Sequence, residues 1–490
     1  MTVRDRYAER TVCFYDTFVF LNFYTLLANH CQISLVSLIV VFEEFLWKQQ
    51  SSYQNLFIMK NLFSSVIALM LLGVPGVISA QTQRSKEFKD KYQLKEAVVL
   101  SRHNIRSPLS DSKSDLGRMT PHKWTEWSAG KSELTSRGGV LETMMGQYFR
   151  KWLVDAGMFP ENYVPTADDI NVIANSMQRC IATAQYFSSG FMPVGGIRVN
   201  HRYTPSKMDP LFNPQLTKVS PEFVKVAMEQ INAMGGEKGI VGINEAIAPD
   251  YALMTEVLDV SDSPMAKSDD PKLKALDNYN TEIVLEKWAE PSMKSGSALK
   301  ELNSASDAFI LQYYEEPDSM KAAFGHNLTR EDWAKLAHVK DTYQDVLFTA
   351  PIVAVNVANP LIRYMYDELR SPDRKFTFLV GHDSNLSSVA TALGIEEYEL
   401  PEAIEKKTPI GSKLVIEKFV GPDGEEYADI NIVYQSVDQL RDMELLDLNN
   451  PPQIYPLSFK GLSKNADGLY KMSDVASRFE QALKAYEDIP

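Results

Sequence analysis

The sequence predicts an α/β protein, in which a mostly parallel sheet is flanked by helices and a smaller helical cap is inserted between two parts of the sheet. Two observations predict this fold. Short apolar segments typical of buried strands are each followed by a polar loop and then by a helical pattern, an order typical of parallel sheets. From about Ser206 to Lys340 the apolar strands stop, and polar helix-forming segments alternate with Pro and Gly, which indicates a helical insertion.

The expected elements follow in order along the chain. The first strand is expected at residues 97–100, because Ala-Val-Val-Leu is an uninterrupted apolar run. Thr135 is the expected N-cap of a helix whose apolar residues up to Leu153 share one face. The remaining strands are expected at 171–174, 376–380, 413–418 and 429–434, and the remaining helices from about 180, at 354–369 and up to 393.

The bulk composition argues against one class of function. The 490 residues are 44% hydrophobic and 23% charged, as in ordinary globular proteins. The formal net charge is −14 and no long run of Lys or Arg occurs. This argues against nucleic-acid binding, because nucleic-acid phosphates require a basic surface. A small phosphorylated molecule remains compatible with an acidic protein, since a single pocket can be locally basic.

The N-terminal region predicts export. Residues 59–80 combine a positive Lys60, an apolar stretch and the small-residue sequence Ile-Ser-Ala before Gln81, which is typical of a signal peptide. We therefore expect a periplasmic or secreted protein. Residues 1–58 are compatible with a membrane-spanning helix or with a misassigned start, Met59 being the true first residue. The complete signal peptide favours the second interpretation, so membrane contact is expected only if residues 1–58 are part of the translated protein.

The mature chain is expected to contain one catalytic domain interrupted by a cap. The first part of the α/β catalytic domain is expected at 81–205, the helical cap at 206–340 and the second part at 341–490. The cysteines are Cys13, Cys31 and Cys180. Cys180 alone would remain after removal of the leader, so no intramolecular disulfide is expected. No Cys/His cluster in the sequence suggests a structural metal.

Polar loops after the predicted strands carry the residues with catalytic potential. They are Arg102, His103 and Arg106 after the first strand, Arg179 after the second, and His382 and Asp383 after the third. In open α/β sheets, ligands bind beyond the carboxyl ends of the strands. The three loops could therefore converge on one ligand.

These residue types suit the transfer of a phosphoryl group. Arginine guanidinium groups match phosphate oxygens and neutralise their charge. The imidazole of His103 can attack phosphorus, the carboxyl of Asp383 can protonate the leaving oxygen, and His382 can donate a hydrogen bond to the phosphoryl group. Taken singly, an Arg-His pair is usually solvated, Arg179 a salt-bridge partner and Asp383 a helix cap. Their shared position after apolar strands favours the chemical interpretation.

The same motifs resemble those of the histidine acid phosphatase family. The hallmark of that family is an Arg-His-Gly-x-Arg-x-Pro loop with a distant His-Asp pair. Here residues 102–108 read Arg-His-Asn-Ile-Arg-Ser-Pro and residues 382–383 read His-Asp. The similarity is closest to bacterial periplasmic glucose-1-phosphatases, which also have Asn after the His, and it extends over nearly all of residues 81–490. Supporting stretches are 120–127, 134–142, 175–179, 208–214, 311–315 and 408–411.

The resemblance implies a fold, an activity and residue roles. It implies a phosphoglycerate-mutase-like α/β domain with a helical domain over the site, a small-molecule phosphate ester as substrate, and no metal or organic cofactor. His103 would be the nucleophile and Asp383 the proton donor. The phosphate would be bound by Arg102, Arg106, Arg179 and His382.

Two further residues are expected to bind substrate. Asn104 stands where the family usually has Gly, which is expected to place a bulky polar group near the leaving-group pocket and to reshape substrate choice. Glu290 belongs to a Glu-Pro pair where the glucose-1-phosphatase branch has a carboxylate that contacts the sugar. The alternative for Glu290 is a solvated residue at a helix end.

Three other functions compete with this one. An inositol-polyphosphate phosphatase (phytase) would share the phosphate pocket, and its highly charged substrate would favour extra cations such as Lys113, Lys123 or Lys207. A phosphoglycerate-mutase-type phosphotransferase is disfavoured by the signal peptide and the large insertion. An exported sugar-phosphate-binding protein without turnover is disfavoured because His103 and Asp383 are both present. The sequence makes no prediction of the oligomeric state.

Overall fold

The computed structural model describes residues 84–490 except 111–112, 167 and 269. The predicted signal peptide, residues 1–58, Cys13 and Cys31 lie outside the described residues. Within the described residues, no single helix is long and apolar enough to cross a membrane. Only α14 (Arg330–Phe348) and α15 (Pro351–Leu369) pass that test by length and composition, and they do so as a pair bent by 86°.

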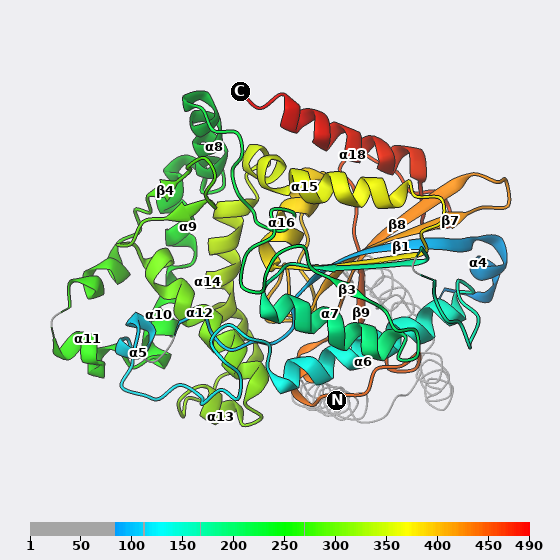
Figure 1. Ribbon diagram of the computed structural model, residues 1–490. Coiled ribbons are helices and arrows are strands. Elements are labelled where there is room, and N and C mark those ends of the chain that lie inside the picture. Colours follow the sequence, from blue (N-terminus) through cyan, green and yellow to red (C-terminus); the bar gives the residue numbers. More distant parts are fainter. Residues whose placement is uncertain (1–83, 111–112, 167, 269) are drawn as a thin grey trace, which may run out of the picture. The chain divides into compact units, whose positions relative to one another are not determined.

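One sheet of eight strands organises the described chain (Figure 1). Its parallel half contains β1 (Gln93–Arg102), β6 (Phe376–Gly381), β2 (Ile170–Ala174) and β3 (Val199–Asn200), in that spatial order. Each of the strands expected at 97–100, 171–174 and 376–380 is present within this half. The predicted α/β class is therefore confirmed.

The other half of the sheet is antiparallel. It contains β7 (Lys413–Val420), β8 (Glu426–Tyr434), β9 (Gln453–Pro456) and β10 (Tyr470–Lys471). The sheet is thus mixed, and less parallel than the sequence predicts. The reason is the short connection between β7 and β8, which closes around Gly424 with a φ of +81°. A connection of this length can only join antiparallel strands, since parallel neighbours require a long crossover.

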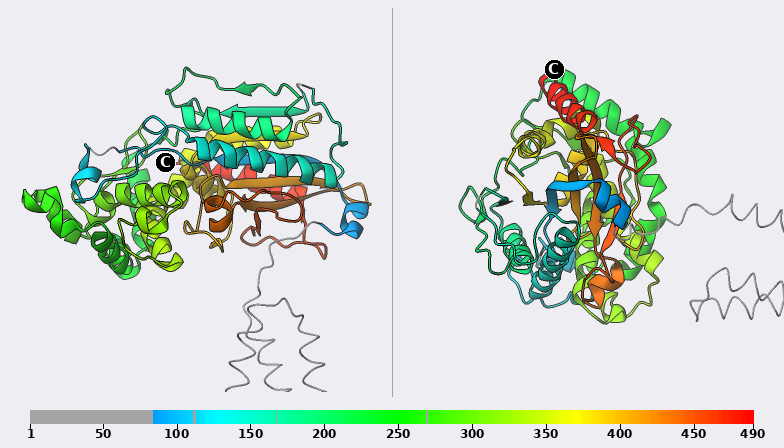
Figure 2. Two further views of the ribbon diagram at one scale, coloured as in Figure 1. Left: turned by 90° about the horizontal axis from the view of Figure 1, so that it is seen from below. Right: turned by 90° about the vertical axis from the view of Figure 1, so that its right-hand side faces the viewer.

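Helices cover both faces of the sheet (Figures 1 and 2). On one face, α6 (Ser136–Asp155) and α7 (Gln178–Phe191) pack over a core that includes Val99 and Phe378. On the other face, α15, α16 (Asp383–Ala392) and α18 (Met472–Glu487) pack over Val98 and Leu379. Because successive strand residues point to opposite faces, one apolar run such as β1 supplies both cores.

The chain between β3 and β6 contributes helices rather than sheet strands. It contains α8 (Pro221–Ala233), α9 (Ile240–Ala246), α10 (Ala248–Val257), α11 (Pro264–Lys267), α12 (Ala298–Glu315), α13 (Ser319–Ala322), α14 and α15, with a separate hairpin of β4 (Ile283–Val284) and β5 (Ser292–Met293). The cap boundary expected at residue 340 falls inside α14, so that helix runs from the insertion towards the sheet.

Short helices elsewhere are α4 (Lys86–Lys91), α5 (Asp115–Arg118) and α17 (Val437–Arg441), and the 3-10 turns are Gly236–Lys238, Val260–Asp262 and Pro271–Asp277.

Candidate functional site

The site forms where the central parallel strands end at the same level. In the register of the sheet, Arg102 of β1 lies opposite Gly381 of β6, and Ala174 of β2 lies opposite Val380. The loops that leave these strands therefore emerge side by side. The backbone N–H of His103 donates to Gly381 O at 3.0 Å, which ties the first loop to the end of β6.

His103 is held in one tautomer. Its Nδ1 lies 2.9 Å from the carbonyl oxygen of Asn104. A carbonyl can only accept a hydrogen bond, so Nδ1 carries the proton and the lone pair lies on Nε2. Burial lowers the pKa of His103 well below its usual value, and the charges of Arg179, His382, Arg106 and Arg102 lower it further. The ring is therefore neutral and can act as a nucleophile through Nε2.

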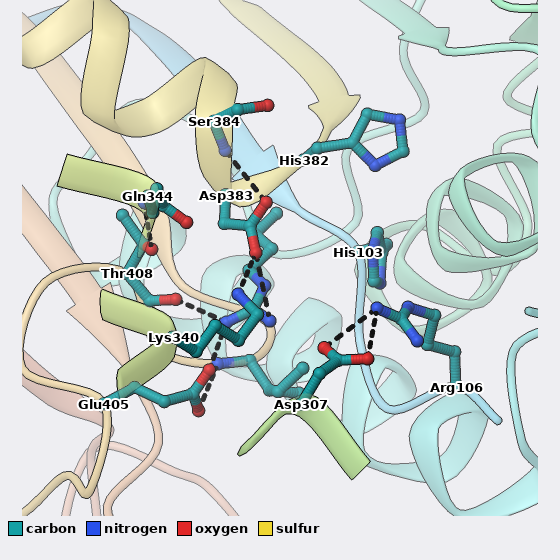
Figure 3. Close-up of polar contacts among 12 residues, drawn as sticks. His103, Arg106, Asp307, Lys340, Gln344, His382, Asp383, Ser384, Glu405 and Thr408 are labelled. Carbon is teal, nitrogen blue, oxygen red and sulfur yellow. Dashed lines mark hydrogen bonds and ion pairs between the residues drawn. The ribbon is translucent and has the colours of Figure 1, made fainter. Parts of the chain in front are cut away.

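Two of the nearby arginines are oriented by carboxylates. Arg102 donates to Glu405 and to the carbonyl of Thr408, and Arg106 donates from Nη2 to both oxygens of Asp307, at 3.0 and 3.1 Å. Figure 3 shows Asp307 against Arg106 beside His103. Arg102 is 1% exposed and Arg106 5% exposed, so both cations are held rigidly inside the protein.

Arg179 differs from these two arginines. It is the second residue of α7 and is buried, and burial lowers its pKa. Its Nε atom, like the Nε atoms of Arg102 and Arg106, is buried without a hydrogen-bond partner among residues 84–490 as described. Buried donors normally have acceptors. The charges of these three arginines lower the pKa of His103, so their guanidinium groups lie near its ring. Three unpaired donors in one place suit an anion with several oxygens.

His382 lies next to His103, with the ring centroids 5.4 Å apart. The side-chain oxygen of Asn175 accepts from the backbone N–H of Asp209 at 3.0 Å, so the amide NH₂ of Asn175 faces the ring and donates to Nε2 of His382 at 2.7 Å. The neutral ring therefore carries its proton on Nδ1. Burial lowers the pKa of His382 well below its usual value, and Arg179 adds to this effect.

Asp383 begins α16 and faces two cations. Lys340 of α14 donates to its Oδ2, and Nη2 of Arg102 lies 3.4 Å from the same oxygen (Figure 3). Burial alone would raise the pKa of Asp383, but Lys340 and Arg102 together hold it well below its usual value. With no substrate bound, the carboxyl is thus ionised over most of the pH range. Any role as a proton donor requires that its pKa rise when an anion binds nearby.

The structure places the two predicted substrate-binding residues differently from each other. Glu290 is exposed overall, yet desolvation of its carboxyl by the surrounding protein raises the pKa of that group. The charge of Arg179 opposes this rise and that of Asp383 adds to it. It therefore lies within electrostatic range of the site. The side chain of Asn104 is instead turned inward: the residue is 1% exposed, and its amide donates to Glu142 at 2.8 Å. This differs from the position at the leaving-group pocket that the sequence suggests.

Three residues at the site have no counterpart in the sequence prediction. They are Asp307 on α12, Lys340 on α14 and Glu405 in the loop before β7. The nearest sequence signals are two stretches that support the family resemblance, 311–315, which begins four residues after Asp307, and 408–411, which begins three residues after Glu405. The three lysines proposed for a more anionic substrate, Lys113, Lys123 and Lys207, are exposed.

The comparison that decides the family covers both motifs and the strands of the sheet from β1 to β8. Residues 93–435 match the Histidine phosphatase superfamily (branch 2). The chain belongs to this family. It is a phosphatase of the histidine acid phosphatase type, which confirms the activity predicted from the motifs.

Characterised histidine phosphatases resemble nearly all of the described chain. A glucose-1-phosphatase of Salmonella typhimurium is 37% identical over 425 residues, covering 85% of this chain and 99% of the relative. Phytase AppA of Escherichia coli is 26% identical and covers 85% of this chain and 96% of the relative. Among solved structures, a Hafnia alvei phytase in complex with myo-inositol hexakis sulphate superposes with a TM-score of 0.71 at 26% identity, covering 80% of this chain and 98% of that chain.

Replacing Lys340 by Met is expected to move the pH profile of this histidine phosphatase. Loss of the cation raises the pKa of Asp383, so the protonated acid persists to higher pH. The alkaline limb of kcat/KM for an alkyl phosphate should therefore shift upwards, by on the order of one pH unit. Lys335→Met on the same helix is the matched control, because Lys335 is more exposed and pairs with Glu331 and Asp332. An unchanged or lowered alkaline limb in Lys340→Met would contradict this assignment.

Proposed function

We propose that this phosphatase hydrolyses sugar phosphate monoesters such as glucose 1-phosphate through a phosphohistidine on His103, with Asp383 as the proton donor. The observation that carries the proposal is the neutral, Nδ1-protonated His103 beside three buried arginines whose Nε–H groups have no partner among the described residues. A nucleophile with a free Nε2 lone pair and a set of oriented cations are the two requirements of phosphoryl transfer through an enzyme intermediate.

The first step transfers the phosphoryl group to the protein. Nε2 of His103 attacks phosphorus while the bond between phosphorus and the leaving oxygen breaks. The leaving alkoxide takes the proton of the Asp383 carboxyl, because an alkoxide is too basic to depart unprotonated. Arg102, Arg106 and Arg179 offset the negative charge of the phosphoryl oxygens, and the neutral ring of His382 donates a hydrogen bond to them from Nδ1.

The second step returns the protein to its starting state. A water molecule attacks phosphorus, its proton passes to the Asp383 carboxylate, and the bond between phosphorus and Nε2 breaks. Inorganic phosphate leaves and His103 is again neutral. Asp383 must be protonated before each first step, and a bound dianionic ester favours this because its charge opposes those of Lys340 and Arg102.

The identity of the ester is supported by the relatives and by the charge of the site. The glucose-1-phosphatase of Salmonella typhimurium is more similar to this chain than phytase AppA is. Three cations of the site are paired with acids: Asp307 pairs with Arg106, Glu405 with Arg102, and Asp383 with Lys340. Glu290 adds a further carboxyl nearby. Such a site suits one phosphate on a neutral, hydroxyl-bearing group better than a polyphosphate.

The proposal is tested by phosphate release from glucose 1-phosphate, inositol hexakisphosphate, 4-nitrophenyl phosphate and 3-phosphoglycerate, measured with chelator present. We expect glucose 1-phosphate to have the highest kcat/KM among the natural esters. A preference for inositol hexakisphosphate would instead favour the phytase alternative. Release only from 3-phosphoglycerate, or from none of these esters, would overturn the proposal.

Replacing Glu290 by Gln is expected to weaken sugar recognition selectively. A hydrogen bond to a charged group is lost, so kcat/KM for glucose 1-phosphate should fall by about tenfold. The value for 4-nitrophenyl phosphate should stay nearly unchanged, because that ester has no sugar hydroxyls. Glu286→Gln is the control, since Glu286 is exposed in the same connection between β4 and β5. Equal losses for both esters would argue against sugar contact by Glu290.

We further propose that the protein is exported, on the strength of the leader at residues 59–80. N-terminal sequencing of the protein recovered from its native compartment should begin at Gln81. An N-terminus at Met1 in a cytoplasmic protein would contradict export.

A further inference from the structure

We propose that Glu142 and Lys413, a buried ion pair, are positioning residues that act through Asn104 to hold the tautomer and orientation of His103. This inference rests on the proposed role of His103 as nucleophile. It assigns a function to two charged residues that do not themselves contact the arginines or the acid of the site.

The pair joins helix α6 to strand β7 in the interior. Oε1 of Glu142 lies 2.9 Å from Nζ of Lys413, and both side chains are 0% exposed. Lys413 also lies beside the rings of Phe187 and Phe378, with Nζ 5.8 and 5.7 Å from their centroids. A buried ion pair among apolar groups contributes little net stability, because desolvation offsets the attraction. The contacts of the pair therefore point to a geometric role.

Glu142 fixes the side chain of Asn104. Its Oε2 accepts from the Asn104 amide at 2.8 Å, and the side-chain oxygen of Asn104 accepts from the backbone N–H of Ile105 at 2.8 Å. The backbone N–H of Asn104 donates to Oγ1 of Thr183 at 3.1 Å. With these groups held, the carbonyl of Asn104 is directed at Nδ1 of His103, the contact that selects the nucleophilic tautomer.

Lys413 closes the same set of contacts from the other side. Its Nζ donates to the carbonyl of Gly411 at 2.8 Å, and the backbone N–H of Gly411 donates to the carbonyl of His103 at 3.2 Å. The contacts thus form a closed circuit, which runs from the His103 ring through Asn104, Glu142, Lys413 and Gly411 back to the His103 backbone. Gly411 has a φ of +69°, and a Cβ there would lie 2.7 Å from the Asn104 amide nitrogen. Glycine is therefore required where this circuit passes Asn104.

The circuit also explains why a side chain is accommodated directly after the nucleophile. Asn104 stands where the family motif has Gly. An amide buried at this position needs an acceptor, because an unpaired buried donor is costly. Glu142 is that acceptor, and Lys413 compensates the charge that Glu142 brings into the interior. The three residues form one unit whose parts depend on one another.

The test is a set of variants in two backgrounds, the unchanged protein and the Asn104→Gly variant. Glu142→Leu with Lys413→Met removes both charges together, which leaves no uncompensated buried ion. In the unchanged background, kcat for 4-nitrophenyl phosphate should fall on the order of tenfold, as for the loss of one hydrogen bond to a charged group, with KM nearly unchanged. In the Asn104→Gly background the same pair of substitutions should have little effect, because the side chain that needs Glu142 is absent.

A second readout reports the tautomer directly. In ¹⁵N-histidine spectra of the unchanged protein, the His103 ring should show a protonated Nδ1 and an unprotonated Nε2. The Glu142→Leu/Lys413→Met variant should show a mixture of the two tautomers. Thermal unfolding of each variant establishes that it is folded, and Glu142→Gln, which keeps an oxygen for Asn104, should retain more of kcat than the double variant.

A second buried pair on the same strand supplies the control. Glu96 of β1 and Lys418 of β7 are 2.6 Å apart and lie further along the sheet from His103. Glu96→Leu with Lys418→Met should change stability without changing kcat or the His103 spectrum. Equal kcat losses in the unchanged and Asn104→Gly backgrounds, or a His103 spectrum that the Glu142→Leu/Lys413→Met change leaves unaltered, would overturn the inference. Absence of any phosphohistidine in the unchanged protein would instead overturn the proposed function.

Discussion

Replacement of His103 by Ala is expected to abolish phosphate release from every ester, with a loss of on the order of 10⁴-fold or more in kcat, as when a covalent nucleophile is removed. None of the other residues described at the site can take over its task. His382 is the nearest imidazole, but its Nε2 accepts a hydrogen bond from Asn175, which engages the lone pair that an attack on phosphorus would require.

The loss in His103→Ala should appear in kcat rather than in ligand binding. Of the arginines proposed to bind phosphate, Arg102 is positioned by Glu405 and Arg106 by Asp307, not by His103. Inorganic phosphate should therefore still inhibit or bind, as measured by calorimetry. His122→Ala is a suitable control, because His122 pairs with Asp259 at 2.6 Å and makes none of the contacts described for the site. Activity in His103→Ala comparable to that of the control would contradict the assignment.

Replacement of Asp383 by Asn is expected to produce a loss that depends on the leaving group. For glucose 1-phosphate the alkoxide needs a proton, and kcat should fall by roughly 10²- to 10⁴-fold, the usual worth of a positioned general acid. For 4-nitrophenyl phosphate the departing phenolate is a stable anion, so the first step should be slowed far less. The two substrates are controls for each other, since a general structural defect would slow both.

The pH dependence of this variant provides a second check. Asp383→Asn removes the proposed proton donor, whose deprotonation is expected to limit activity at high pH, so the alkaline limb of kcat/KM for glucose 1-phosphate should disappear. In the unchanged protein, Lys340 and Arg102 lower the pKa of Asp383, which places that limb at low pH, because kcat/KM reports the ionisation of the free enzyme. An unchanged profile in Asp383→Asn, or equal losses for both esters, would show that another group donates the proton.

The central strands and the loops that follow them could be predicted because both depend on local sequence. The run Ala97–Leu100 is apolar without a break, so it predicts a buried strand wherever its partners lie. His103 and His382 follow two such strands, and parallel strands end at one edge of a sheet, which is why these residues are brought together. The N-cap at Thr135 likewise depends only on its own helix, and its side chain accepts from the backbone N–H of Gly138.

The antiparallel half of the sheet departs from the mostly parallel prediction, although a local signal for it exists. Gly421-Pro422-Asp423-Gly424 lies between two apolar runs, and this composition is typical of a tight turn between hairpin strands. The order of strand, loop and helix that predicts a parallel sheet therefore does not extend to the runs at 413–418 and 429–434. No helix separates β7 from β8, so the two strands pair as a hairpin.

The residues that orient the site could not be predicted from local sequence. Asp307 and Lys340 lie within long amphipathic helices, where an Asp or Lys is usually solvated. Their roles depend on how α12 and α14 pack against the ends of the strands, which no short pattern encodes. The inward direction of Asn104 depends in the same way on Glu142, a residue 38 positions away in the sequence.

The most direct measurement is the detection of the covalent intermediate on His103. The purified protein is mixed with excess glucose 1-phosphate in the presence of chelator, denatured within milliseconds in alkali, and mapped by mass spectrometry. We predict a single phosphate on His103, stable in alkali, lost in acid and formed at least as fast as turnover. Full phosphate release with no phosphate on His103, or with phosphate on a different residue, would contradict the phosphohistidine mechanism.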